Sequence, residues 1–204
     1  MWPMLPSLPT LRSSLLRMHR VIFDIDEITW RSHSALPLTN LERMVIVLED
    51  RRFFWHKGID ARSIVRELFK ALTLRRFGGA STIDVQLFRT VSDRYERTAR
   101  RKLREFVGAY ALQKKFSKIQ LLRAYLNVAY FGTGLRGADA ASQDEYGKNA
   151  SELSLEEAAV IASFLVYPKP SISSLNWRTK IGRRADYGCL LVRTLEKGNY
   201  QTLG

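Results

Sequence analysis

Residues 49–60 of the chain read Glu-Asp-Arg-Arg-Phe-Phe-Trp-His-Lys-Gly-Ile-Asp. The two adjacent acids follow an apolar segment with a helical repeat, formed by Leu41, Met44, Val45 and Leu48. A carboxylate at the end of such a helix would lie at the rim of a core, where partial desolvation suits it to proton transfer. The alternative is a helix end that carries ordinary solvated charges.

Apolar residues recur with helical spacing along most of the chain, which predicts a mostly α fold. The predicted helices run from about 37 to 49, 60 to 77, 81 to 91, 95 to 116, 117 to 130, 158 to 166 and 178 to 196. Polar residues that can cap a helix N-terminus mark several starts: Thr39 or Asn40, Ser81 or Thr82, Ser117 with Gln120, and Ser154 with Glu157. Alternation typical of a strand never persists beyond a few residues.

The length of 204 residues and a hydrophobic fraction of 46% predict one domain, over residues 36–198. Residues 1–35 are interpreted as a leader or linker and residues 199–204 as a tail. The leader lacks an apolar run long enough to span a bilayer, so an interfacial membrane anchor and a disordered leader both stay open. The single cysteine, Cys189, excludes an internal disulfide and a cysteine-rich zinc site.

The chain is strongly basic, with 33 Lys or Arg against 20 Asp or Glu and a formal net charge of +13. Such a surface favours an anionic partner: a nucleic acid, an anionic lipid or a phosphorylated substrate. Much of the excess lies in residues 89–123, which hold eleven Lys or Arg and three acids. Within this stretch Glu105 follows Arg101 and Lys102 at helical spacing. The stretch either binds a polyanion or forms a solvated helix face.

Residues 78–89 read Gly-Gly-Ala-Ser-Thr-Ile-Asp-Val-Gln-Leu-Phe-Arg. A glycine pair followed by Ser-Thr at a helix start can offer N–H groups and hydroxyls to an anion such as phosphate. The alternative is an ordinary glycine turn before a capped helix.

Taken together, in this order and spacing, these motifs resemble the peptidoglycan glycosyltransferase domain. This is the lysozyme-like transglycosylase module of penicillin-binding proteins and of monofunctional transglycosylases. The first motif matches through Glu49, Asp50, Phe53, His56, Gly58 and Asp60; the second through Gly78, Gly79, Ser81, Thr82, Ile83, Gln86 and Leu87; the third through Arg101, Lys102 and Glu105. Further matches follow at 117–118, 125–132, 137–148 and 151–159, with a weaker one at Arg183-Arg184. The resemblance covers about three quarters of the chain, from Pro37 to Leu195.

The resemblance implies a lysozyme-like multi-helix fold and polymerisation of lipid II into glycan strands, with inversion and release of undecaprenyl pyrophosphate. It implies Glu49 as the general base and Glu105 as the second catalytic carboxylate, on the donor side. The residues expected to bind substrate or pyrophosphate are Asp50, Phe53, His56, Ser81, Thr82, Gln86, Arg89, Arg101, Lys102, Lys118 and Asn127. Of these, His56 is expected to fix the Glu49 loop by hydrogen bonding. Since the length leaves no room for a transpeptidase domain, a monofunctional enzyme is expected.

A membrane setting follows from the same resemblance. The residues expected to face the membrane are Leu68, Phe69, Leu72, Leu74 and Phe77. The expected partners are lipid II, the growing glycan strand, an anionic membrane surface and other cell-wall synthesis proteins, with no nucleic acid. The expected location is the inner (cytoplasmic) membrane, with the catalytic domain on its periplasmic or extracytoplasmic face. No cofactor is required, although a divalent cation (Mg²⁺ or Mn²⁺) can assist, with Asp84 as the candidate position.

Several positions depart from the family pattern. Asp84 and Val85 stand where Thr-Gln is usual, Thr90 where Asn is usual, and Arg123 reverses a charge. Arg136 and Glu145 replace aromatics. Asp84 is expected to add negative charge near the pyrophosphate group. An active, divergent member is favoured because both carboxylates are present, and the alternative is a weak or inactive relative that acts as a lipid II or cell-wall scaffold.

Two further alternatives belong to other classes. A basic helical nucleic-acid-binding protein would need a helix-turn-helix charge pattern, which the sequence lacks. A peptidoglycan-cleaving enzyme of lysozyme type needs one Glu acid but has no pyrophosphate to hold, so the grouped cations favour synthesis.

Overall fold

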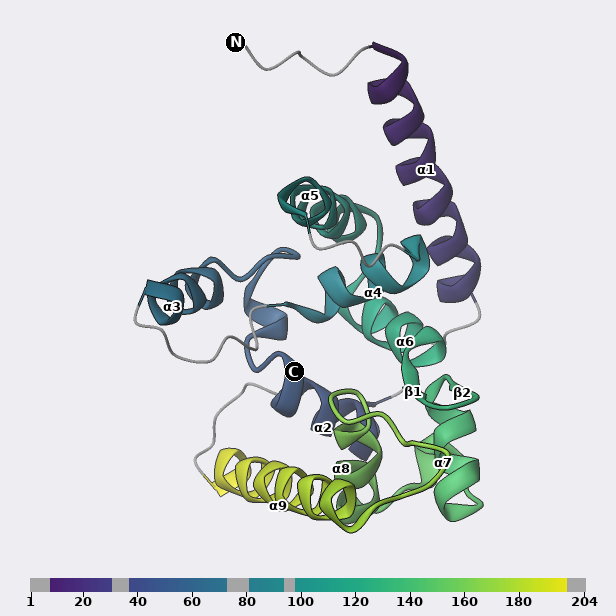
Figure 1. Ribbon diagram of the computed structural model, residues 1–204, viewed down its shortest axis with the longest axis vertical. Coiled ribbons are helices and arrows are strands. Elements are labelled where there is room, and N and C mark those ends of the chain that lie inside the picture. The colour runs from purple at the N-terminus through teal and green to yellow at the C-terminus, as the bar shows by residue number, and fades with distance from the viewer. Residues whose placement is uncertain (1–7, 31–36, 73–80, 94–97, 198–204) are drawn as a thin grey trace.

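The computed structural model describes residues 8–30, 37–72, 81–93 and 98–197, and the predicted mostly α fold is confirmed (Figure 1). The elements in chain order are α1 (Leu8–Trp30), α2 (Asn40–Glu49), the 3₁₀ turn η1 (Phe53–Trp55), α3 (Ala61–Leu72), α4 (Ile83–Ser92), α5 (Ala99–Lys115), α6 (Lys118–Val128), β1 (Tyr130–Gly132), β2 (Leu135–Arg136), α7 (Ala138–Tyr146), the 3₁₀ turn η2 (Ala150–Glu152), α8 (Leu155–Ser163) and α9 (Leu175–Lys197).

Helix starts follow the predicted caps. Ser117 with Gln120 and Ser154 with Glu157 form capping boxes, in which each side chain bonds the other residue's backbone N–H. At α2 the cap is Thr39, in a box with Glu42. At α4 the cap is Thr82 rather than Ser81, which leaves the Ser81 hydroxyl available to other side chains.

The helices form two packed groups, which Figure 1 shows one above the other. In the lower group α2 packs against α8 and α9, and in the upper group α4 packs against α5 and α6. Gly188 allows α9 to approach α2, because a Cβ at this position would lie 2.7 Å from the Met44 sulfur. Gly108 does the same for α5, because a Cβ there would lie 2.2 Å from the Phe88 ring. The small residues therefore fix how closely the site-bearing helices pack.

Helix α1 differs from the leader or linker predicted for residues 1–35. Val21, Ile25 and Thr29 are buried at intervals of one helical turn, and Lys115 of α5 pairs with Asp26 at 2.6 Å. Figure 1 shows the first half of α1 projecting past the body while its second half lies against it. The stripe is short and interrupted by acids, so hydrophobicity along the sequence did not mark it. Among the described residues, no helix combines the length and apolar character needed to cross a membrane.

The glycine-punctuated segment after α6 forms a small antiparallel pair, with Tyr130 opposite Arg136 and Gly132 opposite Leu135. The backbone of Lys169 joins this pair through Lys169 N–H to Phe131 O at 2.8 Å and Thr133 N–H to Lys169 O at 2.9 Å. Helix α6 consequently ends at Val128, two residues before the predicted end, because the chain turns into the strand. The segment ties the loop after α8 to the end of α6.

Candidate active site

Glu49 is the last residue of α2, and two side chains from distant helices hold its carboxylate. Arg184 of α9 donates through a guanidinium NH₂ to Oε1 at 2.5 Å, and Gln86 of α4 donates through Nε2 to Oε2 at 3.3 Å. The Glu49 side chain is 11% exposed. The carboxylate therefore lies at the rim of the core, as predicted, with each oxygen engaged by a different helix.

Gln86 is itself fixed by Tyr125 of α6, whose hydroxyl donates to Gln86 Oε1 at 2.7 Å. Burial, together with the nearby Glu49 charge, raises the pKa of Tyr125 above its ordinary value. The phenol thus stays protonated and remains a donor, which orients the Gln86 amide so that its NH₂ group faces Glu49. Tyr125 is a member of the site to which the sequence analysis gave no role.

Glu105 of α5 is 2% exposed and lies among three cations. Arg89 of α4 donates to both oxygens, at 2.8 and 3.1 Å, and Arg101 donates to Oε1 at 2.5 Å. Lys102 Nζ lies 3.6 Å from Oε2. Among the described residues, Glu105 is the one buried carboxylate that pairs with these three cations, which are referred to below as the cation cluster (Arg89, Arg101 and Lys102).

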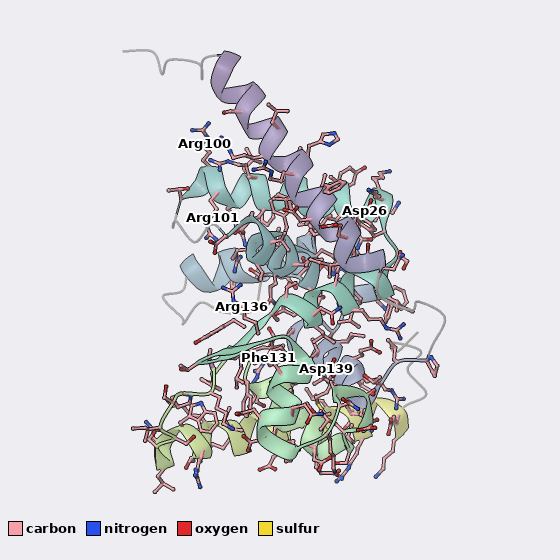
Figure 2. All side chains as sticks on the ribbon, turned by 90° about the vertical axis from the view of Figure 1, so that its right-hand side faces the viewer. Asp26, Arg100, Arg101, Phe131, Arg136 and Asp139 are labelled. Carbon is pink, nitrogen blue, oxygen red and sulfur yellow. The ribbon has the colours of Figure 1, made fainter. Side chains whose placement is uncertain are left out.

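The cation cluster reaches Ser81, whose hydroxyl accepts from Arg89 NH₂ at 3.3 Å and from Lys102 Nζ at 3.2 Å. Burial lowers the pKa of Lys102, and the neighbouring Arg89 and Arg101 charges add to this effect against the opposing attraction of Glu105. The Nε atom of Arg101 is buried without a hydrogen-bond partner in the described structure. Figure 2 shows Arg101 on the side of α5 that faces the body, whereas Arg100 lies on the outer side. An anion placed beside Ser81 would meet several donors at once.

Helix α4 connects the two carboxylates. Gln86 and Arg89 lie three residues apart, hence on one face of the helix, and they contact Glu49 and Glu105 respectively. The N-terminus of the same helix binds Asp50, because Ile83 N–H donates to Asp50 Oδ2 at 3.2 Å. The position of α4 therefore sets how the residues of the first and third motifs face each other.

Four residues expected to contact substrate lie in the framework beneath this surface. Asp50, Phe53, His56 and Thr82 are all buried. The Thr82 hydroxyl donates to Gly58 O at 2.6 Å and caps α4, and His56 Nε2 lies 2.9 Å from Asp50 Oδ2. Since their polar atoms are engaged with the fold, these residues shape the site from below, as the sequence analysis expected for His56.

Asp84 does not face the cation cluster, in contrast to the expectation that its charge lies near a pyrophosphate. It is fully buried on the inner side of α4, where its two oxygens accept from Gln113 at 2.7 Å and Lys118 at 2.9 Å. Lys118, expected to bind substrate, has its ammonium directed to this carboxylate. Within the described residues no group of three or more His, Cys, Asp or Glu side chains is arranged to hold a metal ion. A divalent cation at Asp84 does not fit these contacts.

The remaining predicted residues lie elsewhere or outside the described structure. Asn127 is exposed at the end of α6, where it lines a hollow with Asp24, Glu27 and Ile28 of α1. On α3, Phe69 is exposed, and so is Val65, which the sequence analysis did not include. Leu74, Phe77, Gly78 and Gly79 lie outside the described residues, as do the side chains of Leu68 and Leu72.

Arg184 is the main site residue to which sequence reasoning assigned no role. The Arg183-Arg184 pair was noted as a weak motif match, but its helix lies far along the chain from Glu49. The available signal was the helical repeat of α9, which places Ile181, Ala185 and Gly188 on the buried face and Arg184 beside it. That repeat predicts a face but not the partner across it.

Comparison with known proteins finds relatives over the part of the chain that contains these motifs. A family model described as Transglycosylase matches residues 22–187. Penicillin-binding protein 2a of Streptococcus pneumoniae is 38% identical over 163 residues, which are 76% of this chain and 22% of that protein. Penicillin-binding protein 1A of Rickettsia bellii is 34% identical over 169 residues (81% and 21%), and penicillin-binding protein 1F of Bacillus subtilis is 33% identical over 167 residues (78% and 23%). The chain spans about a fifth of the length of these relatives.

Proposed function

The chain belongs to the transglycosylase family, the family of the glycosyltransferase domains of penicillin-binding proteins, and from this premise we propose that it polymerises lipid II into glycan strands. One observation carries the proposal: helix α4 contacts two carboxylates, Glu49 through Gln86 and Glu105 through Arg89. The second carboxylate is surrounded by the cation cluster. A hydrolase of lysozyme type has no need of that cluster.

In the proposed reaction Glu49 is the general base. It accepts the proton of the acceptor's 4-hydroxyl as that oxygen attacks C1 of the muramyl donor. The bond from C1 to the pyrophosphate oxygen breaks, the configuration at C1 inverts, and undecaprenyl pyrophosphate leaves with the bonding electron pair. A positioned base contributes about 10²–10⁴-fold to such a step. Arg184 and Gln86 support this role because they hold the carboxylate in one orientation.

The cation cluster would stabilise the departing pyrophosphate. Negative charge grows on the leaving group in the transition state, so fixed donors at that point lower the barrier. Arg89 and Arg101 suit phosphate oxygens through paired N–H donors, and Lys102 adds a point charge. Glu105 would act by keeping these cations assembled near Ser81 before the substrate binds.

The scaffold alternative depended mainly on Asp84 as a negative charge beside the phosphate group. The burial of Asp84 against Gln113 and Lys118 supports the catalytic alternative, because that charge is directed away from the cation cluster. Lipid II as substrate would place the domain at the extracytoplasmic face of the cytoplasmic membrane. The exposed Val65 and Phe69 of α3, on a chain of net charge +13, suit contact with an anionic lipid surface.

The test is polymerisation of purified lipid II by the purified chain, with the products separated as glycan strands on a gel. Glu49→Gln keeps the size of the side chain and removes the base, and it should reduce strand formation at least about 10²-fold. Glu156→Gln is the matched control, because the Glu156 side chain is exposed and forms an exposed ion pair with Arg193 of α9. Strands from the wild type and the control but not from E49Q support the proposal. Tight lipid II binding without strands in all three would support the scaffold instead.

A further inference from the structure

A buried chain of four titratable side chains lies beneath Glu49, and the proposed reaction uses none of them directly. It runs from Asp50 to His56, then to Lys118 and Asp84, and each side chain comes from a different segment of the fold. Asp50 and His56 flank η1, Asp84 begins α4, and Lys118 begins α6. All but Lys118 are buried, and the Lys118 side chain is 14% exposed.

The two ring nitrogens of His56 have different neighbours. Nε2 lies 2.9 Å from Asp50 Oδ2, whereas Nδ1 lies 3.4 Å from Lys118 Nζ and 3.8 Å from Asp84 Oδ2. An ammonium group has donors only, so a ring nitrogen that hydrogen-bonds to it must be an acceptor. The imidazole hydrogen then belongs on Nε2, where it donates to Asp50. Asp60 also interacts electrostatically with the ring, and the ring edge packs near Phe53.

Lys118 is kept in place by Asp84. Burial raises the pKa of Asp84 and lowers the pKa of Lys118, and the attraction between the two opposes both shifts. The ammonium also lies 4.3 Å from the centre of the Phe53 ring, a favourable position for a cation. Removing either partner would leave the other as a costly uncompensated charge. Each charge therefore depends on its partner.

The series of buried side chains from Asp84 to Asp50 ends beside Glu49, the proposed general base. Asp50 directly follows Glu49, and the Asp50 oxygen that receives His56 also accepts the Ile83 N–H at the start of α4. A His56 ring with its hydrogen on Nε2 thus helps to join the end of α2 to the helix that carries Gln86. If the His56 ring turned, this connection would be lost.

We propose that Asp84 and Lys118 form a positioning pair, in which Asp84 keeps Lys118 in place and Lys118 keeps the hydrogen of His56 on Nε2, and that the pair thereby fixes Asp50 and the adjacent Glu49 against α4. The pair acts through other residues and touches no substrate. Its effect on turnover rests on the proposed glycosyl transfer, whereas its effect on His56 does not.

The first test is ¹⁵N NMR of the imidazole ring in the full chain. The chain has three histidines, so a His19→Gln/His33→Gln background leaves His56 as the sole signal. Neutral tautomers differ in their ring nitrogen shifts, and the Nε2–H form is expected at neutral pH. In K118M the two flanking carboxylates stay, so the His56 titration midpoint should move to higher pH by about one unit or more. In D84N the ammonium loses its counter-charge and the midpoint should move to lower pH.

The opposite directions of these two shifts separate electrostatic positioning from simple loosening of the core, which would move both variants the same way. The double variant D84N/K118M should return the midpoint to a value between the two single variants. Arg123→Met is the matched control: Arg123 also lies on α6 and forms a buried pair, with Glu42, but it does not contact His56. If K118M fails to fold, K118R can be used in its place: it keeps a cation beside Nδ1 and should preserve the Nε2–H tautomer of His56. An Nδ1–H tautomer, or equal shifts in D84N and K118M, would overturn the proposal.

Turnover provides the second readout. K118M should lower kcat about tenfold at neutral pH with little change in KM, because Glu49 is misplaced while the cation cluster is intact. If the NMR pattern holds but the wild type makes no strands, the positioning pair stands and the proposed function fails. If strands form without the NMR pattern, the reverse is true.

Discussion

Arg184 of α9 donates to the carboxylate of Glu49 at the end of α2, with an NH₂ to Oε1 distance of 2.5 Å across 135 positions of sequence. The same NH₂ group lies 3.4 Å from Leu48 O, and the Nε atom is buried without a hydrogen-bond partner among the described residues. The general base proposed here is thus held from the C-terminal helix as well as from α4. This makes α9 part of the site and not only of the core.

Replacing Arg184 by Met should reduce strand formation from lipid II by about 10- to 100-fold, mainly in kcat, because Glu49 would keep only its Gln86 contact. Arg184→Lys should be intermediate, since an ammonium cannot reproduce the planar donor geometry. Arg183 is exposed, and R183M serves as the matched control with near wild-type rates. Equal losses in R183M and R184M would indicate a general effect of basic charge.

Replacing Glu105 by Gln should tighten the binding of inorganic pyrophosphate while it slows strand formation. The three cations would lose the buried counter-charge of Glu105 and attract an added anion more strongly, by about tenfold at low salt. Titration calorimetry with pyrophosphate measures this directly, and the difference should shrink as salt is raised. Weaker binding by E105Q would show instead that the role of Glu105 in keeping the cations assembled outweighs the effect of its negative charge on an added anion.

Pyrophosphate binding should weaken at a lower pH than it would if Lys102 had the usual pKa of a lysine. Burial lowers the pKa of Lys102 from its usual 10.5, helped by the Arg89 and Arg101 charges. Lys102 is a cation below that lowered pKa and loses its charge as pH rises through it, so its contribution to anion binding is lost over the same interval. Lys102→Arg stays protonated and should keep its affinity at high pH. Parallel pH profiles for the wild type and K102R would argue against a role for Lys102 in binding.

The second half of α1 should behave as part of the domain. Ile25 is fully buried, so Ile25→Ala should lower the free energy of unfolding by about 2–4 kcal/mol through lost contacts and a cavity. Phe23 lies two residues away but is mostly exposed, and F23S is expected to change stability little. Urea unfolding followed by circular dichroism compares the two. A small effect of I25A on the free energy of unfolding would mean that residues 21–29 do not contribute to the stability of the domain.

Local sequence was enough to predict most of the helices and several of their caps, although not α1 or α7. Thr39, Ser117 and Ser154 start helices where the spacing of polar and apolar residues says they should, because an N-cap bond joins residues only three apart. The family resemblance of the three motifs, and not local spacing, implied that Glu49, Glu105 and the neighbouring cations belong to one site. The α1 stripe was missed because its three buried positions are separated by acids that point elsewhere.

The sequence by itself determined which side chains carry charge and chemistry in this protein, and where along the chain they stand. Only the tertiary structure decided which way they face. Asp84 and Gln86 lie two residues apart on α4, yet one turns into the core to meet Lys118 and the other turns outward to Glu49, because two residues of a helix span about 200° of rotation. The pairing of Arg184 with Glu49 required the packing of α9 on α2, a contact between segments that no local pattern encodes.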